Sequence, residues 1–227
     1  MVKTVIFDLD DTLYEFGPAE QTGRAAIRDY AERVIGVSGD EFMENFIEML
    51  RLQIRLHSDA AGSHSRAIRA QLVCEKMGLP LHHAAIINDL FWKAYIDSIT
   101  PFDGIPELFS AIRAKGLKIG ICTNMTADWQ LKKLTKLGLV DLCNFDVSSE
   151  EAAVEKPVRA IFDLCVEKAG CLPEECLFIG DNPNFDIRGA LDAGMQALWL
   201  AQNPETRAKH PDLPFVASPR EIASRIL

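Results

Sequence analysis

Three carboxylates lie within four positions directly after the first apolar run of the chain. Asp8, Asp10 and Asp11 follow residues 5–7, whose continuous apolar side chains are typical of a buried parallel strand. Like charges this close repel one another unless a cation lies among them, and oxygen ligands suit a divalent ion. The stretch therefore predicts a cation site at the carboxyl end of a strand, where open α/β sheets bind their ligands. An ordinary acidic turn is the alternative interpretation.

Polar side chains also follow three later strands that the sequence predicts. They are Thr123 and Asn124 after residues 117–122, Lys156 after residues 144–147, and Asp181 with Asp186 after residues 176–179. Taken singly, a Thr-Asn turn or a lysine before a proline is more often solvated surface. If the strands are parallel, however, all these residues lie along one edge of the sheet and can converge. We expect them to form one site with Asp8 and Asp10.

Two kinds of sequence pattern predict the elements that must position these residues. Residues 16–98 have helical periodicity, with an inward face in the second helix that includes Phe42, Phe46 and Ile54. From Thr100 onward, helices alternate with short apolar strands, and such β-α repeats form parallel sheets. The predicted fold class is α/β, a Rossmann-like parallel sheet core with helices on both faces, plus an inserted all-α helical bundle.

The expected elements also give the domain boundaries. Helices are expected from Pro18 to near Gly36, from Ser38 to Ile54, over 66–77 and over 84–99, with a loop at 58–65. Further helices are expected at 105–115, 126–137, 157–169 and 184–193, and strands at 196–200 and 215–217. We place the core domain at residues 1–15 and 99–227 and the helical domain at residues 16–98.

Composition excludes several classes of function. The chain has 227 residues, and its formal net charge of −9 argues against binding to a nucleic acid polymer or a membrane surface. No apolar stretch approaches the ~20 residues of a membrane span, and Lys3 and Asp8 interrupt the first apolar run, so we expect no signal peptide. The six cysteines lack metal-ligand spacing, which favours reduced thiols. We expect a cytoplasmic protein that is a monomer or a homodimer.

The ordered set of polar residues resembles that of the haloacid dehalogenase-like (HAD) superfamily over essentially the whole chain. The motifs that carry the resemblance are Asp8-Leu9-Asp10-Asp11-Thr12-Leu13, Thr123-Asn124, Lys156-Pro157 and Gly180-Asp181-Asn182-Pro183-Asn184-Phe185-Asp186. The helical insertion after the first motif is similar to the cap of one subgroup, and the likeness is greatest to nucleotidase and phosphoglycolate phosphatase members. The resemblance also implies that the first strand lies centrally, between the strands of the second and fourth motifs.

The resemblance implies phosphoryl transfer by two carboxylates with different roles. Asp8 would attack phosphorus and form an aspartyl-phosphate. Asp10 would protonate the leaving alcohol and then activate water, so its carboxylate should not bind the metal. Mg²⁺ would be held by Asp8, the backbone carbonyl of Asp10, and Asp181. Dehalogenases of the superfamily lack a carboxylate at the position of Asp10. The presence of Asp10 therefore favours a phosphatase. Asp11 is expected to stabilise the turn.

The remaining motif residues would bind the phosphate group. The Thr123 hydroxyl, the Lys156 ammonium and backbone amides around Leu9 and Asn124 would hold its oxygens as they gain charge. Asp186 would act behind the metal ligands, ordering a bound water or Lys156.

The helical insertion is expected to contribute substrate contacts. The best candidates are Tyr14, Phe16 and the region from His57 to Arg69. Arg55, His57, His64, Arg66 and Arg69 form a locally basic segment in an acidic protein. The segment is either a solvated helix face or a place where one or two side chains reach an anionic part of the substrate.

The sequence thus predicts a Mg²⁺-dependent phosphatase that acts on a small soluble phosphorylated metabolite, such as a nucleotide or a sugar phosphate. A sugar-phosphate mutase of the same superfamily shares all four motifs and is an alternative. A regulator that binds a phosphorylated metabolite without turnover is another. A signalling receiver module is disfavoured, because its acceptor aspartate lies on a later strand and it has no inserted helical lobe.

Overall fold

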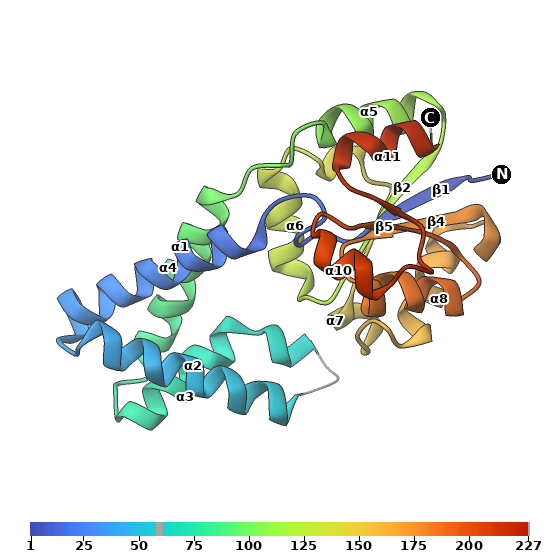
Figure 1. Cartoon of the computed structure of the whole chain (residues 1–227). Helices are drawn as coiled ribbons and strands as arrows, with labels where there is room; N and C mark the ends of the chain where they lie inside the picture. The colour runs from blue at the N-terminus through green and yellow to red at the C-terminus, as the bar shows by residue number, and fades with distance from the viewer. Residues whose placement is uncertain (58–60, 227) are drawn as a thin grey trace. The chain divides into compact units, whose positions relative to one another are not determined.

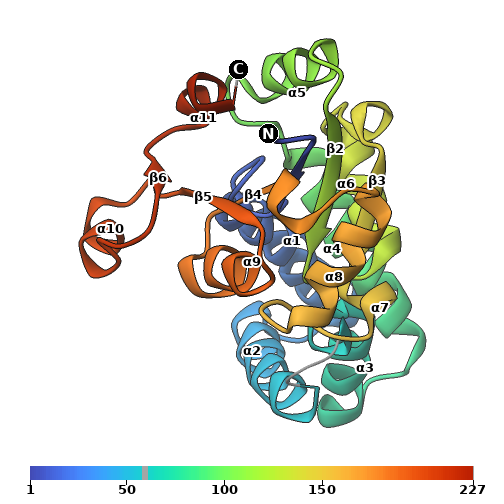
Figure 2. The same cartoon turned by 90° about the vertical axis from the view of Figure 1, so that its right-hand side faces the viewer.

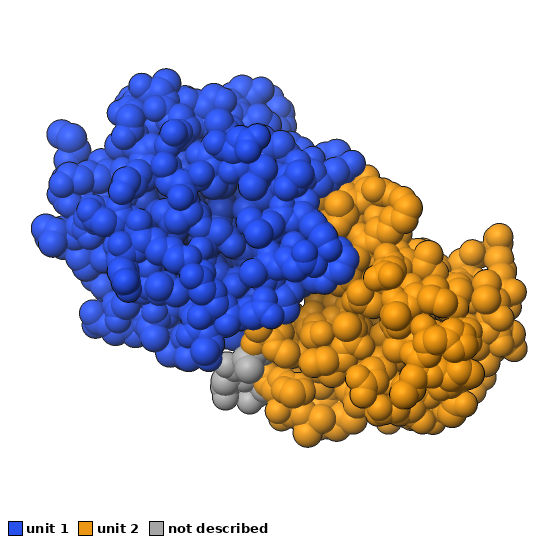
Figure 3. All heavy atoms as spheres, turned by 180° about the vertical axis from the view of Figure 1, so that it is seen from behind, with its two compact units in different colours: residues 1–15, 100–227 blue, residues 16–99 orange. Residues whose placement is uncertain are grey.

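The structure, a computed structural model, describes residues 1–57 and 61–226. The chain divides into two compact units, one formed by residues 1–15 with the chain from Thr100 onward and the other by residues 16–99 (Figures 1 and 3). Ile99 groups with the helical unit, one residue beyond the predicted boundary. Within the described residues, no helix has both the length and the apolar character that crossing a bilayer requires.

A six-stranded parallel sheet forms the core of the first unit. Its strands are β1 (Thr4–Phe7), β2 (Lys118–Thr123), β3 (Phe145–Ser148), β4 (Cys176–Gly180), β5 (Gln196–Leu200) and β6 (Phe215–Val216). Their order in the sheet is β3-β2-β1-β4-β5-β6, and Figure 2 labels all of them except β1. Phe7 is in register with Ile121 on one side and Ile179 on the other, so these three strands end at the same edge. The predicted parallel sheet with a central first strand is confirmed.

Helices cover both faces of this sheet, as predicted. Successive strand residues point to opposite faces, and Phe7 stacks on Phe109 at 4.8 Å whereas Phe178 meets Phe162 at 5.4 Å. Phe109 belongs to α5 (Ile105–Ala114), which packs beside α11 (Pro219–Ile226) (Figure 2). Phe162 belongs to α8 (Arg159–Ala169), which packs beside α9 (Gly189–Asp192). The other helices of this unit are α6 (Ala127–Lys136), α7 (Ser149–Ala152) and α10 (Pro204–Lys209).

The second unit is a helical bundle around an aromatic core. Its helices are α1 (Phe16–Tyr30), α2 (Gly39–Leu56), α3 (Arg66–Met77) and α4 (His82–Ser98). Ser38 caps α2 by accepting a hydrogen bond from the Glu41 amide, as its position before two acidic residues predicts. Gly78 ends α3 with a left-handed backbone, φ +64°. The inward face of α2 passes through Gln53, whereas Ile54, which was predicted to point inward, is exposed.

Some local elements differ from the prediction. Residues 58–60 of the predicted loop lie outside the described residues, and Ala61–His64 form a 3₁₀ helix. The helix expected at 184–193 is a π-helical segment, Pro183–Arg188, followed by α9. The short helices α7 and α10 were missed, because single turns of helix leave too little periodicity to recognise.

Candidate active site

A buried lysine between two buried aspartates forms the centre of the candidate site. Lys156 Nζ lies 2.6 Å from Asp8 Oδ1 and 2.6 Å from Asp186 Oδ1, and it donates to the Cys122 carbonyl at 3.1 Å. Burial opposes the charged ammonium, but Asp186 and Asp8 outweigh it and hold the pKa of Lys156 well above its ordinary value. The structure thus brings Lys156 to Asp8, 148 positions away, and to Asp186, 30 positions away.

The backbone at the strand ends fixes these side chains. The Asp8 amide donates to the Ile179 carbonyl at 2.8 Å, which continues the pairing of β1 with β4 one residue past the strand. The Thr12 hydroxyl donates to Asp8 Oδ2 at 3.4 Å. The Asn124 side chain binds the backbone of Lys156 at two points. Its Oδ1 accepts from the Lys156 amide at 2.7 Å, and its Nδ2 donates to the Lys156 carbonyl at 3.2 Å.

Asp186 reaches the site because of the glycine that ends β4. A Cβ atom on Gly180 would meet Asp186 Oδ2 at 2.4 Å, so only glycine permits this approach. Asp186 Oδ2 also accepts from the Asn182 amide at 2.9 Å. With Lys156 on one oxygen and an amide on the other, Asp186 is placed to orient the lysine.

A third carboxylate, Asp181, completes an acidic cluster. One oxygen each from Asp8, Asp181 and Asp186 lies within 4.8 Å of the others. Burial raises the pKa of Asp8 to about 7 although Lys156 opposes the rise, and Asp186 and Asp10 add to it. Burial likewise raises the pKa of Asp181 to about 8, with Asp8, Asp186 and Asp11 contributing. The cluster therefore carries more negative charge than its surroundings stabilise.

The donor set of this cluster fits a divalent cation. Asp8, Asp10, Asp181 and Asp186 face two lysines, Lys156 and Lys133, so full ionisation leaves two negative charges in excess. All the candidate ligand atoms are oxygens, which hard cations such as Mg²⁺ prefer. A buried acidic cluster of this kind can bind a metal ion.

We expect the free energy of unfolding of the metal-free protein to fall as the pH rises from about 5 to about 8. Asp8 and Asp181 have folded-state pKa values of about 7 and about 8, against about 3.9 in an unfolded chain. The folded state therefore binds more protons over this range, and stability decreases as they are lost. Because Mg²⁺ binds ionised carboxylates, it should raise the melting temperature more at about pH 8 than at about pH 5.5. Thermal denaturation in EDTA and in Mg²⁺ measures both effects.

Two variants make this test specific. Asp181→Asn should flatten the pH dependence and reduce the effect of Mg²⁺, because it removes the group with the pKa of about 8. Asp128→Asn is the matched control, since Asp128 is an exposed carboxylate paired with Lys132. Asp146, whose pKa burial raises to about 6, contributes equally in all three proteins. Identical pH slopes for wild type and Asp181→Asn would contradict the expectation.

The Asp10 carboxylate contacts a lysine that sequence reasoning missed. Lys133 Nζ lies 2.7 Å from Asp10 Oδ1 and 2.9 Å from Asp10 Oδ2, and the Tyr14 hydroxyl also donates to Oδ1. Lys133 is buried on the inward face of α6 with Gln130 and Leu134. The three- and four-residue spacing of these side chains could have indicated that Lys133 is buried. A buried lysine requires a partner of opposite charge.

The phosphate-binding candidates lie at the same edge of the sheet. Phe7 pairs with Ile121, so Leu9 and Thr123, each two residues further along, lie at the ends of neighbouring strands. Thr123 is buried as the last residue of β2, and Leu9 is fully buried. The side chain of Asn124 is occupied by the Lys156 backbone, which leaves only its backbone amide for the predicted role.

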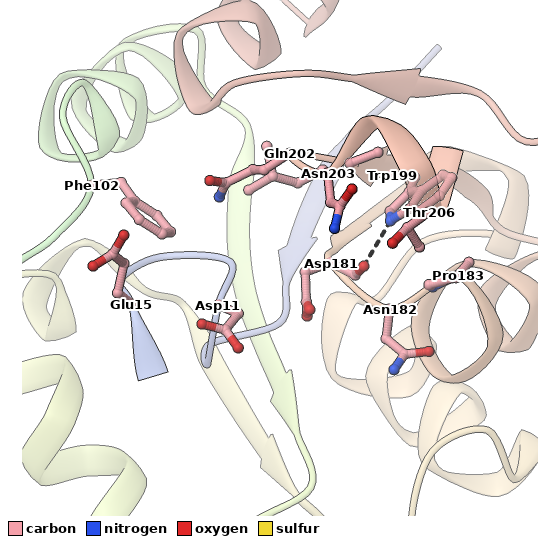
Figure 4. A pocket seen from close by; sticks show the side chains of 12 residues that line it. Asp11, Glu15, Phe102, Asp181, Asn182, Pro183, Trp199, Gln202, Asn203 and Thr206 are labelled. Carbon is pink, nitrogen blue, oxygen red and sulfur yellow. Dashed lines mark hydrogen bonds between the residues drawn. The ribbon is translucent and has the colours of Figure 1, made fainter. Parts of the chain in front are cut away.

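Asp11 differs from the neighbouring aspartates because it is exposed. Its backbone is in the left-handed region, φ 57°, which is uncommon for a residue other than glycine. Asp11 and Asp181 line a pocket of about 390 Å³ within the first unit (Figure 4). Figure 4 also shows the indole of Trp199, which donates to the Asp181 carbonyl at 2.7 Å. The predicted role of Asp11 in the turn stays a prediction.

Two arginines of the predicted basic segment are buried inside the helical unit. Arg66 Nη2 lies 2.7 Å from Glu20 Oε2, and Arg69 Nε donates to Gln53 Oε1 at 3.0 Å. Burial, and to a smaller extent the nearby Arg66, lower the pKa of Arg69 to about 9. The interpretation of a solvated helix face is therefore wrong for both arginines, although it holds for the exposed Arg55.

Comparison with known proteins gives consistent results. Residues 2–194 match the family described as haloacid dehalogenase-like hydrolase. The chain is 30% identical over 211 residues to ribulose-1,5-bisphosphate 5-phosphatase of Halopiger xanaduensis, covering 92% of this chain and 88% of that protein. It is 33% identical over 222 residues to glyceraldehyde 3-phosphate phosphatase of Methanopyrus kandleri, covering 94% and 88%. A solved 2-haloacid dehalogenase from Pseudomonas syringae pv. Tomato DC3000 superposes with a TM-score of 0.77 at 26% identity, covering 100% of both chains.

Proposed function

Because the chain belongs to the haloacid dehalogenase-like hydrolase family, we propose that it is a Mg²⁺-dependent phosphatase that hydrolyses a small phosphomonoester. The observation that carries the proposal is the Asp8 carboxylate, buried at the end of β1 and held by Lys156 at 2.6 Å. Lys156 lowers the pKa of Asp8 against the effect of burial, and a bound cation would lower it further, which favours the ionised carboxylate that acts as a nucleophile.

In the proposed reaction, Asp8 and Asp10 divide the chemistry. Asp8 attacks phosphorus while the bond from phosphorus to the leaving-group oxygen breaks, and Asp10 gives that oxygen a proton. Asp10 then takes a proton from the water that attacks the aspartyl-phosphate, and the bond between Asp8 and phosphorus breaks to release phosphate. Asp10 exchanges protons because it lies two residues beyond Asp8 and keeps partial exposure, whereas Asp8 is buried.

Neighbouring groups stabilise the phosphate oxygens in this proposal. The Lys156 ammonium, the Thr123 hydroxyl and the backbone amides around Leu9 and Asn124 bind them as negative charge develops. Asp186 keeps Lys156 directed at Asp8, since both carboxylates contact the same Nζ at 2.6 Å.

The same edge of the sheet would hold the metal ion. Asp8, Asp181 and the Asp10 carbonyl are the proposed ligands, and their oxygens suit Mg²⁺. Bound Mg²⁺ would offset the negative charge of the phosphate group and of the aspartate cluster.

The substrate class we propose is a sugar phosphate or triose phosphate, with nucleotides as a second group. Relatives named for ribulose-1,5-bisphosphate and glyceraldehyde 3-phosphate support this choice. We propose that the helical unit acts as the cap. Its buried Arg66 and Arg69 are engaged by Glu20 and Gln53 and are not assigned to the substrate. Asp10 favours phosphoryl transfer over dehalogenation, which needs no acid for an alcohol leaving group.

A phosphate-release screen tests the proposed function. We expect at least one sugar or triose phosphate to be hydrolysed in Mg²⁺ with kcat/KM of about 10⁴ M⁻¹s⁻¹ or more. p-Nitrophenyl phosphate, a general phosphatase substrate, and 2-chloropropionate, a dehalogenase substrate, belong in the same screen. Chloride release without phosphate release would contradict the proposal, and so would the absence of turnover of every phosphomonoester.

The fate of the phosphorylated metabolite distinguishes a mutase and a regulator from a phosphatase. A mutase returns the phosphoryl group to its product, so a sugar phosphate would be isomerised with little release of phosphate. A regulator would bind a phosphorylated metabolite stoichiometrically in Mg²⁺ and leave it intact. The filled motif positions favour turnover over binding alone.

A further inference from the structure

A buried lysine, Lys133, contacts Asp10, the proposed acid-base residue. Its side chain is 1% exposed, whereas that of Asp10 is 27% exposed. The ammonium contacts both carboxylate oxygens, at 2.7 Å and 2.9 Å, and the Tyr14 hydroxyl donates to one of them. The carboxylate is therefore held from two sides, by residues of a helix and of the first-motif turn.

The helix that carries Lys133 is itself anchored to the sheet. The Ala127 amide at its start donates to Glu150 Oε2 at 2.9 Å, and Gln130 donates to Asp146 on β3. α6 begins at Ala127, shortly after β2 ends at Thr123, so its position is tied to the end of that strand. Burying a lysine in this way is costly unless a partner and a rigid support compensate. The anchored helix and its buried lysine can therefore hold the Asp10 carboxylate in a fixed position.

We propose that Lys133 is a positioning residue for the reaction, which keeps the Asp10 carboxylate aimed at the leaving-group oxygen and at the attacking water. This role presupposes the proposed function, in which Asp10 transfers both protons. The contact orients the Asp10 carboxylate, because one ammonium bound to both oxygens restricts the rotation of the carboxylate group. Displacement of a reacting group by about 1 Å can cost about 100-fold in rate.

The dependence of kcat/KM on the leaving group of the substrate tests this role. An alkyl phosphate needs a proton on its leaving oxygen, whereas p-nitrophenyl phosphate leaves as a stable anion without one. We expect Lys133→Met to lower kcat/KM about 100-fold for the alkyl phosphate that the screen shows to be turned over fastest, and less than about 5-fold for p-nitrophenyl phosphate. For the alkyl phosphate, KM should change little, because the lysine contacts Asp10 rather than the phosphate. For p-nitrophenyl phosphate, kcat and KM should fall together, because Asp10 also activates the water that hydrolyses the aspartyl-phosphate.

A double-mutant cycle shows whether Lys133 acts through Asp10. Asp10→Asn alone should cost about 10²- to 10⁴-fold with the alkyl phosphate, and adding Lys133→Met should cost almost nothing further. Multiplicative losses would overturn the proposal, as would a Lys133→Met variant with wild-type kcat/KM on the alkyl phosphate. Tyr14→Phe, which removes only a hydroxyl, keeps the proposal testable if Lys133→Met does not fold. It should give a smaller loss with the same dependence on leaving group.

Lys132→Met is the matched control, because Lys132 neighbours Lys133 on α6 but pairs with Asp128 on the exposed surface. Its activity should equal that of the wild type.

The variants also separate the proposed phosphatase function from the proposed role of Lys133. Turnover that Asp8→Asn abolishes and Lys133→Met leaves intact would remove only the role of Lys133, whereas absence of any phosphatase turnover in the wild type would remove the proposed function.

Discussion

Replacement of Asp8 by asparagine is expected to reduce phosphate release by about 10⁴-fold or more. An amide oxygen cannot attack phosphorus as a carboxylate does, and no nearby group replaces it within the described site. Lys156 contacts Asp186, Lys133 contacts Asp10, and Asp181 belongs to a different strand end. Steady-state release of phosphate from p-nitrophenyl phosphate and from the best natural-type substrate measures the loss.

The stability of the Asp8→Asn variant separates lost chemistry from lost structure. Because burial raises the pKa of Asp8 to about 7, its ionised form destabilises the metal-free protein at about pH 8. The asparagine variant should therefore melt no lower than the wild type in EDTA at this pH. Asp128→Asn, an exposed change of the same type, is expected to retain full activity. Asp8→Asn with more than about 1% of wild-type activity would exclude covalent catalysis by Asp8.

The convergence of the site was predictable because parallel strands end at a common edge. Asp8 and Asp181 follow β1 and β4, which are neighbours in the sheet. Lys156 comes from the loop after β3, two strands away, yet its long side chain reaches Asp8 at 2.6 Å. The repeated β-α pattern predicted that these residues could converge at one edge, and the family resemblance supplied the strand order that brings them together.

Other contacts depend on packing that local sequence does not encode. Lys133 shares the inward face of α6 with Gln130 and Leu134, but this spacing does not identify Asp10, 123 positions away, as its partner. Asn124 binds the backbone of a loop that lies 32 positions away. Charge alone misleads in a similar way for Arg69, which is buried beside Gln53 although arginine is usually exposed.

Removal of the metal ion is expected to lower phosphatase activity by about a thousandfold, and added Mg²⁺ should restore it. The prediction follows from the charge of the site, where four carboxylates face two lysines. A phosphate group would add further negative charge, so approach of the substrate is unfavourable until a cation is present. Activity measured in EDTA, and again after addition of Mg²⁺ in excess, gives the size of the effect.

Ca²⁺ provides a sharper comparison, because it accepts the same oxygen ligands but prefers longer distances and higher coordination numbers. We expect Ca²⁺ to raise the melting temperature, since charge compensation needs only binding, and to restore less than about a tenth of the activity, since catalysis needs the geometry of Mg²⁺. Asp181→Asn should weaken the thermal shift caused by either ion. Undiminished activity in EDTA, together with no thermal shift in Mg²⁺, would show that Lys156 and Lys133 alone balance the charge of the aspartates.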